Sequence, residues 1–282
     1  MSLFRIPWNS LKTRVTLLTL AIFLISLWSM LWYASQMLRR DLIALLSAQQ
    51  FTSASVVASE IDDALNFRIR ALTGLARRIP PDLLSDSAAV QSLLDQHPIM
   101  EDLFNRGFIA VNAQGSMIAE IPRSAQRVGI NVADREYFQS ALTQGKPIVS
   151  QPLVSRKSPS PIVVIAVPIL DAQGRASGVL AGVIDLRQPN FLDRITENRY
   201  GKTGETFLVT PQTRMIVSTS DKSRIMEVLP APGTSSWIDR FMQGYEGSAV
   251  VVNPHGQDVL VSVRQIPIAG WYASVILPTR EA

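Results

Sequence analysis

The chain has 282 residues, of which 47% are hydrophobic, 27 are Lys or Arg and 23 are Asp or Glu, and it has no Cys. This composition excludes a disordered chain, a disulfide scaffold, a Cys-ligated metal centre and thiol catalysis. Five of the basic residues and no acidic ones lie in the first 40 residues, so the rest of the chain is nearly neutral and we expect no nucleic-acid partner.

A charge-free apolar run, VTLLTLAIFLISLWSMLWYA, covers residues 15–34. At ~1.5 Å per residue, a helix of this length crosses a hydrocarbon core of ~30 Å. The alternative is a cleaved signal peptide, but the run exceeds the usual apolar core of about 7–15 residues and no small-x-small pair ends it. We therefore expect an uncleaved single-pass anchor, with residues 1–14 in the cytoplasm and the rest of the chain outside.

The segment after the anchor has the pattern of a long helix. No Gly precedes Gly74 and no Pro lies between Pro7 and Pro80, while apolar residues recur at roughly helical spacing. The pattern predicts a stalk helix over residues 36–79. A helix packed along a globular domain is the other interpretation, and the two are compatible if only the outer half packs.

Beyond Pro80 the sequence changes to short β-branched runs with frequent Gly and Pro, which is typical of an α+β domain. A strand pair, a helical segment and further strands are predicted twice, over residues 107–121, 133–145, 161–170 and 176–186, and over 205–219, 235–244, 248–266 and 271–278. We therefore predict two modules, each a five-stranded antiparallel sheet with helices on one side, built along the stalk helix. Their predicted bounds are residues 80–186, a linker over 187–204, and residues 205–280.

The segment Asp134-Arg135-Glu136-Tyr137-Phe138 opens the first of these helical segments. Asp134 is placed to cap the helix by accepting a backbone N–H of its first turn. Capping does not explain Arg135 and Tyr137. An arginine at the mouth of a pocket offers a bidentate grip on a carboxylate, and an aromatic ring beside it closes the site. The segment is a candidate anion site, with a solvated arginine as the alternative.

Several segments, in this order, resemble the double Cache (tandem PAS-like) extracytoplasmic sensor of bacterial transmembrane receptors: GFIAVNAQG, DREYFQSAL, QGKPIVSQPLVS, YGKTGETFLV and GWYASVILP. The resemblance covers about residues 36–280 and is nearest in texture to the sensors of GGDEF diguanylate cyclases, then of histidine kinases and chemoreceptors. It implies a bacterial inner-membrane protein whose periplasmic, membrane-distal module binds a small ligand. A helix shift would carry the signal across the membrane to an output domain that this chain lacks, and we expect a homodimer.

The resemblance also implies site residues. In amino-acid-binding relatives, an Arg-x-Trp-Tyr segment grips the ligand carboxylate and part of its ammonium group, and a later Asp completes the ammonium cage. Arg135 and Asp185 match the Arg and the Asp, while Tyr137 and Phe138 stand at the Trp and Tyr positions, so one hydroxyl is lost. Because fewer polar groups face an ammonium, we expect a small organic ligand with a carboxylate or similar anionic group rather than an unmodified α-amino acid. We add Arg123 as a further candidate; the alternatives are a strand-end cap for Asp185 and a surface position for Arg123.

No combination of nucleophile, base and oxyanion donor stands out, so we expect no enzyme, cofactor or metal site in this chain. Gly201-Lys202-Thr203 lacks the first Gly of a phosphate-binding loop and is interpreted as a turn, and the only histidines, His97 and His255, share no metal-ligand spacing. The Ser- and Pro-rich residues 155–161 form either a loop over a pocket or a simple connection. The alternative function is a membrane-tethered protein-interaction or dimerisation module without a small-molecule ligand, in which side chains would fill the distal pocket.

Overall fold

The computed structural model describes residues 11–97, 102–196, 204–253 and 256–279. The chain divides into two compact units, Met1–Ala48 and Gln49–Glu281. Helix α1 (Leu11–Ala76) begins in the first unit and ends in the second, so the predicted anchor and stalk are one continuous helix. Most of the predicted cytoplasmic segment, the turn at residues 201–203 and His255 lie outside the described residues.

The described part of the first unit is the first half of α1, which is a candidate membrane span. A window of this helix has a mean hydropathy of 2.1, and none of the window is buried within the protein. The hydroxyls of Thr19 and Ser26 donate to the backbone carbonyls of Val15 (3.1 Å) and Ile22 (2.8 Å). These two side chains therefore need no water to satisfy their hydrogen bonds, which suits a helix in hydrocarbon.

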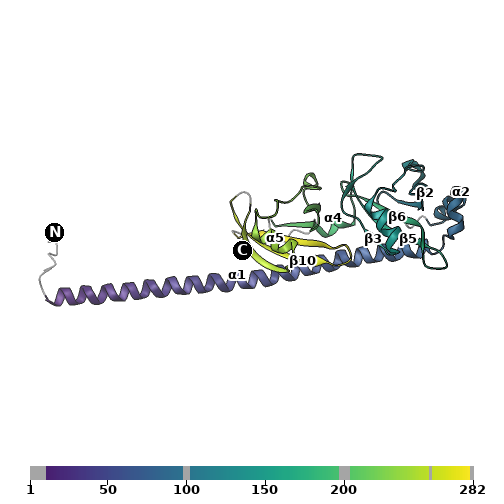
Figure 1. Cartoon of the computed structure of the whole chain (residues 1–282). Coiled ribbons are helices and arrows are strands. Elements are labelled where there is room, and N and C mark those ends of the chain that lie inside the picture. The colour runs from purple at the N-terminus through teal and green to yellow at the C-terminus, as the bar shows by residue number, and fades with distance from the viewer. Residues whose placement is uncertain (1–10, 98–101, 197–203, 254–255, 280–282) are drawn as a thin grey trace. The chain divides into compact units, whose positions relative to one another are not determined.

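The second half of α1 forms one side of the core of the second unit. Seven of its buried apolar residues recur every three or four positions and so share one face: Ala54, Ala58, Ile61, Leu65, Ile69, Leu72 and Ala76. Residues of both sheets join this face in a single core cluster. Figure 1 shows the strands of both sheets along this part of the helix. The packed interpretation of the outer helix is therefore confirmed.

The first sheet has the order β2 (Met117–Ile121), β1 (Phe108–Asn112), β6 (Ala176–Asp185), β5 (Pro161–Leu170) and β3 (Ile148–Val149), and β4 (Leu153–Val154) also pairs with β5. All pairs are antiparallel. The sheet therefore has six strands rather than the predicted five, because two-residue strands such as β3 and β4 leave no periodic signal.

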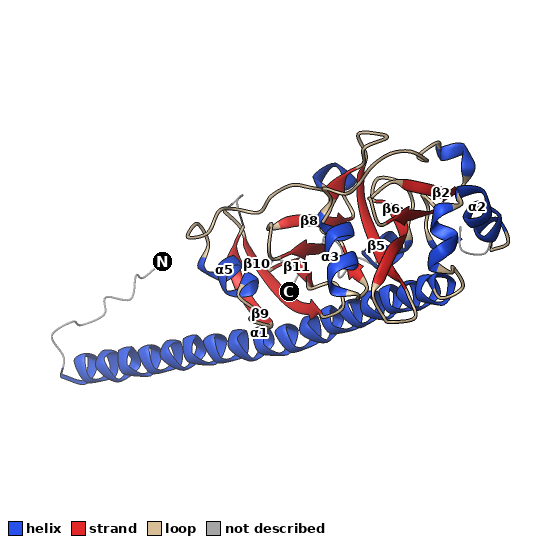
Figure 2. Cartoon of the chain, turned by 45° about the vertical axis from the view of Figure 1, so that its right-hand side comes forward, coloured by secondary structure: helices blue, strands red, loops and turns tan. Residues whose placement is uncertain are grey.

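Both faces of the first sheet are covered, which explains why β5 is apolar throughout. One core cluster contains residues of α1 and α2 (Ser87–Asp95) together with Val163, Ile165 and Val167 of β5. A short 3-10 helix, η1 (Pro81–Ser85), precedes α2 in the chain. The alternate residues Ile162 and Val164 belong to the cluster under α3 (Glu136–Gln144). Figure 2 shows α3 on the sheet. Helices therefore lie on both faces, with α2 joining the stalk helix on the face opposite α3. The prediction of helices on one side was wrong for this sheet, because both faces of its central strands are apolar and need a cover.

The second sheet repeats the first. Its order is β8 (Met215–Thr219), β7 (Glu205–Thr210), β11 (Trp271–Pro278), β10 (Asp258–Ile266) and β9 (Gly247–Val252), with antiparallel pairs throughout. The helices α4 (Phe191–Thr196) and α5 (Ser236–Met242) and the 3-10 turns η3 (Arg123–Ala125) and η4 (Lys222–Arg224) complete the described elements. The α+β fold with two similar antiparallel modules along one long helix is confirmed.

Candidate functional site

A cavity lies on the face of the first sheet that α3 covers. Its floor is apolar and comes from four strands: Ile109, Met117, Ile162, Val164 and Val183. Its walls come from the start of α3, the segment before it, and residues 153–157. The volume is about 40 Å³, which holds a few water molecules and is well below the ~300 Å³ of an ordinary small-molecule pocket. A larger ligand therefore requires the cavity to widen.

Arg135 enters this cavity because it ends the loop before α3. It is the N-cap residue, and its carbonyl accepts the backbone N–H groups of Phe138 and Gln139, both at 3.1 Å. Asp134, which was expected to cap the helix, instead pairs with Arg156. The side chain of Arg135 extends into the cavity and donates to the carbonyl of Val154 at 3.2 Å. Its remaining N–H groups have no hydrogen-bond partner among the described residues, so they are available to an anion.

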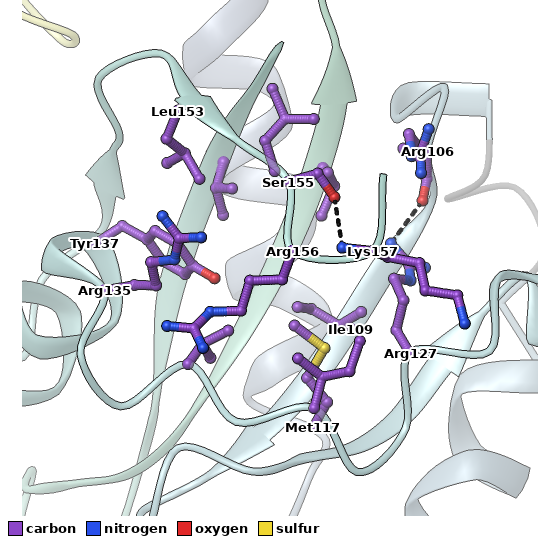
Figure 3. Close-up of a pocket in the computed structure, with 15 residues that line it drawn as sticks. Arg106, Ile109, Met117, Arg127, Arg135, Tyr137, Leu153, Ser155, Arg156 and Lys157 are labelled. Atoms are coloured by element: carbon purple, nitrogen blue, oxygen red, sulfur yellow. Dashed lines mark hydrogen bonds between the residues drawn. The ribbon is translucent and has the colours of Figure 1, made fainter. Parts of the chain in front are cut away.

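Tyr137 is the second residue of α3, and its hydroxyl lies in the cavity between the guanidinium groups of Arg135 and Arg156 (Figure 3). The residue is 5% exposed, and its hydroxyl has no hydrogen-bond partner among the described residues. Burial raises the pKa of Tyr137 to about 12, while the charges of Arg135 and Arg156 oppose the shift. The phenol therefore stays protonated at neutral pH and can donate a hydrogen bond to a ligand.

The cavity is strongly cationic. Among the described lining residues none is acidic and five are basic: Arg106, Arg127, Arg135, Arg156 and Lys157. Three of them have a carboxylate partner outside the lining, in the pairs Arg106–Asp185 (2.9 Å), Arg127–Glu120 (2.9 Å) and Arg156–Asp134. Five cations against three carboxylates leave a net charge of +2. An anion is therefore the ligand that the electrostatics favour.

Asp185 ends β6 behind the cavity wall and does not line the cavity. It is 1% exposed. One carboxylate oxygen accepts from Arg106, and the other accepts from the Ser160 hydroxyl (2.6 Å) and the backbone N–H of Arg187 (3.0 Å). The Arg187 contact is the strand-end role left open above. The carboxylate is therefore already satisfied, and the structure does not bring it together with Arg135 and Tyr137.

Phe138 and Arg123 also lie outside the cavity lining. Phe138 follows Tyr137 on the helix and is 3% exposed in the apolar cluster between α3 and the sheet. Arg123 belongs to η3, where its side chain is 66% exposed and pairs with Asp95 of α2. Of the five predicted site residues, the structure thus places Arg135 and Tyr137 in one cavity, Phe138 in the core beside it, and Arg123 on the surface.

Comparison with known proteins identifies the family. The family model described as "Cache domain" matches residues 34–282. The chain belongs to the Cache domain family. The match covers the second half of α1 and both sheets of this Cache domain, so the resemblance to tandem Cache sensors is confirmed. The link to GGDEF cyclases stays a prediction.

Three relatives show the range of proteins that carry similar domains. This Cache domain is 25% identical to Sporulation kinase D of Bacillus subtilis over 211 residues, which is 73% of this chain and 40% of the kinase. It therefore spans less than half of that relative. The ligand-binding domain of the Pseudomonas aeruginosa amino-acid chemoreceptor PctC, in complex with GABA, matches at 22% identity and TM-score 0.63, over 82% of this chain and 99% of that chain. The ligand-binding domain of the Pseudomonas fluorescens chemoreceptor CtaA, in complex with L-serine, matches at 22% identity and TM-score 0.64, over 86% of this chain and 99% of that chain.

Residues 155–160 of this Cache domain, here called the covering loop, are held over the cavity by polar contacts. Arg106 donates to the Ser158 hydroxyl at 2.9 Å, and the Ser160 hydroxyl donates to Asp185. Arg156 reaches across to Asp134 at the start of α3. The loop therefore covers a pocket, as one of the two sequence interpretations proposed. Its contacts with Arg106 and Asp185 are part-buried, and the Arg156–Asp134 contact is exposed.

Four cationic lining residues of this Cache domain were missed from the sequence: Arg106, Arg127, Arg156 and Lys157. Arg106 and Arg127 lie in connecting segments, where a basic side chain has no periodic signal. Burial lowers the pKa of Arg127, while its hydrogen bond with Glu120 raises it. Because Arg127 is buried and bound to Glu120, we interpret it as a structural cation. The adjacent pair Arg156-Lys157 carried a usable signal, because it lies in the very loop that was a candidate pocket cover.

Proposed function

We propose that the chain is the extracytoplasmic sensor of a bacterial transmembrane receptor and that its ligand binds in the cavity of the first sheet. The observation that supports this most is the convergence of Arg135 and the unpartnered Tyr137 hydroxyl above an apolar floor. A guanidinium and a phenol together bind a carboxylate or similar anion, while the floor takes the apolar part of the ligand.

The signal would leave the cavity through α1. This helix packs on both sheets with its second half and contains the candidate membrane span in its first half. Ligand binding favours whichever packing of the helix it contacts better, so it shifts the population between two states. We propose a homodimer paired through α1 in the inner membrane, and an output domain outside this chain: a diguanylate cyclase, or else a histidine kinase or chemoreceptor.

Calorimetry on the full chain in detergent micelles tests the site, with a panel of organic acids, amino acids, amines and purines. At least one compound, an anion, should bind, and Arg135→Ala should abolish its binding. Arg123→Ala is the matched control, because it removes the same charge from the surface pair with Asp95. Equal binding by the wild type and Arg135→Ala contradicts the assigned site.

A second candidate function is a protein-interaction or dimerisation module without a small-molecule ligand. The observation that favours it is the small volume of the cavity, about 40 Å³. It predicts that no compound in the panel shifts the thermal unfolding of the chain. Sedimentation of the same sample then distinguishes a dimer from a monomer that needs another protein.

A further inference from the structure

The chemical class of the ligand follows from how the charges of the cavity are already used. The cavity has two ends (Figure 3). Arg135, Tyr137 and Arg156 lie at one end, and Arg106, Arg127 and Lys157 lie toward the other. Arg156 and Lys157 are consecutive residues of the covering loop whose side chains diverge toward these two ends. Each end therefore receives one cation from the loop.

The first end has room for one anionic group. Arg135 donates to a single carbonyl, and the Tyr137 hydroxyl has no partner in the part of the chain that the structure describes. The pair between Arg156 and Asp134 is exposed on both sides, at 39% and 66% for the two side chains. Exposed pairs contribute little to stability, so an incoming anion displaces Asp134 at small cost.

The second end also has an uncompensated cation. Arg127 is bound to the buried Glu120 and to the carbonyls of Arg106 and Ile121, and Arg106 is bound to Asp185 and Ser158. Lys157, in contrast, has no carboxylate partner among the described residues. This lysine is therefore the group at that end whose charge a ligand can neutralise.

An ammonium group has no place in the same cavity. None of the described lining residues is acidic, and the two buried carboxylates behind the lining already accept hydrogen bonds from arginines. Enclosing a cation beside five others without an anionic partner opposes binding through both desolvation and repulsion. The resemblance assigned Asp185 to an ammonium cage. In the structure, its carboxylate instead accepts hydrogen bonds from Arg106 and from Ser160 of the covering loop.

We propose that the ligand is a small dianion without an ammonium group, of the short dicarboxylate class. One anionic group binds Arg135, Tyr137 and Arg156, and the other binds Lys157. The apolar floor between them takes the connecting carbons. This inference rests on the proposed sensor function and deepens it, since it names the charge and the spacing that the ligand must have.

Matched compounds test the proposal on the full chain in detergent micelles at neutral pH. Malonate, succinate and glutarate vary the distance between the two carboxylates. Butyrate has a methyl group in place of one carboxylate of succinate, and aspartate adds an ammonium group to succinate. GABA has an ammonium group in place of one carboxylate of glutarate. We expect the best dicarboxylate to bind about tenfold or more tightly than butyrate, aspartate and GABA, with an affinity that falls as salt is added.

Variants assign the two ends. Lys157→Ala should weaken dicarboxylate binding by about tenfold or more and leave butyrate binding unchanged, whereas Arg135→Ala should weaken both. Lys146→Ala, an exposed lysine outside the lining, is the matched control. Circular dichroism confirms that each variant is folded.

Each contrary outcome has a distinct meaning. If aspartate, GABA or a monoanion binds as tightly as every dicarboxylate and its binding needs Arg135, the dianion inference is overturned and the sensor function stands. Dicarboxylate binding that is insensitive to Lys157→Ala also overturns the inference. If no compound in this set or in the wider panel binds, both the inference and the proposed function are overturned.

Discussion

Arg106 and Asp185 form an ion pair of 2.9 Å between the segment before β1 and the end of β6. The Asp185 side chain is 2% exposed and the Arg106 side chain 24% exposed. The same two groups hold two serines of the covering loop, Ser158 and Ser160. The pair thus fixes the loop that closes the cavity: Arg106 lines the cavity and Asp185 lies behind its wall.

Replacing Asp185 by Ala should therefore destabilise the fold. The change leaves Arg106 without its counter-ion and Ser160 without its acceptor; because Arg106 is partly exposed, we expect a loss of about 1–3 kcal/mol rather than the larger cost of a fully buried pair. Urea unfolding of the full chain, followed by circular dichroism, measures it. The control is Asp95→Ala, which breaks the surface pair with Arg123 and should have no measurable effect. Equal stability of the two variants would show that Asp185 has no structural role.

The ionisation of Tyr137 gives a pH-dependent prediction. Burial raises the pKa of Tyr137 from 10.0 to about 12. Because the pKa of the folded state lies above that of the unfolded state, the stabilisation is fully present below pH 10 and is lost as the pH rises through 12. Over this window we expect the free energy of unfolding to fall by roughly 2 kcal/mol more in the wild type than in Tyr137→Phe.

Urea unfolding at several alkaline pH values measures this difference, and tyrosinate absorbance reports the late-titrating phenol directly. Tyr272→Phe is the control, because burial and the nearby Glu246 also raise the pKa of Tyr272. The difference in alkaline stability should be larger for Tyr137→Phe. Identical pH profiles for the wild type and Tyr137→Phe would mean that the phenol is solvated and not enclosed in the cavity.

Most of the fold could be predicted because its elements carry periodic signals. The run over residues 161–170 coincides with β5, and the apolar stretch over 176–186 with β6. Long β-branched runs specify strands through local preference and burial, which a sequence shows directly. The short strands β3 and β4 exist only through pairing with β5, so nothing local predicted them.

The site was only half predictable for a related reason. Arg135 and Tyr137 belong to one helix start, so a local segment contained both. Asp185 and Arg106 are 79 residues apart, and their pairing depends on the approach of β1 to β6. The sequence does not show that Arg106 is the partner of Asp185. The resemblance to amino-acid-binding relatives therefore assigned Asp185 to the ammonium group of a ligand instead. The charges of the cavity thus depend on tertiary contacts that residue spacing does not encode.

Gln50 connects α1 to the second sheet. It is 0% exposed, and its amide nitrogen donates to the carbonyls of Leu260 (3.0 Å) and Val275 (2.8 Å) on two neighbouring strands. Gln50→Ala removes both hydrogen bonds and leaves a small cavity, so we expect a loss of about 2–4 kcal/mol. The neighbouring Gln49 is exposed, and Gln49→Ala should change the free energy of unfolding by less than about 0.5 kcal/mol. Urea unfolding of both variants makes the comparison, and equal effects would exclude a specific contact at Gln50.

Two glycines give opposite predictions for the same substitution. A Cβ atom at Gly182 of β6 would lie 2.2 Å from a ring carbon of Phe104, which is 1% exposed, so Gly182→Ala should cost about 3 kcal/mol through overpacking. At Gly74 of α1 no heavy atom outside the adjoining helix backbone and chain neighbours lies within 4 Å of the added Cβ, and Gly74→Ala should stabilise the protein by about 0.5–1 kcal/mol by favouring the helix.

Thermal and urea unfolding measure both changes, and a double variant separates overpacking from other effects. Phe104→Leu makes room beside residue 182, so Gly182→Ala should cost less in that background than in the wild type. Such coupling is expected only if the ring and the added methyl group compete for one space. Purely additive effects, or a Gly182→Ala protein as stable as the wild type, would mean that Phe104 does not pack against β6 as described.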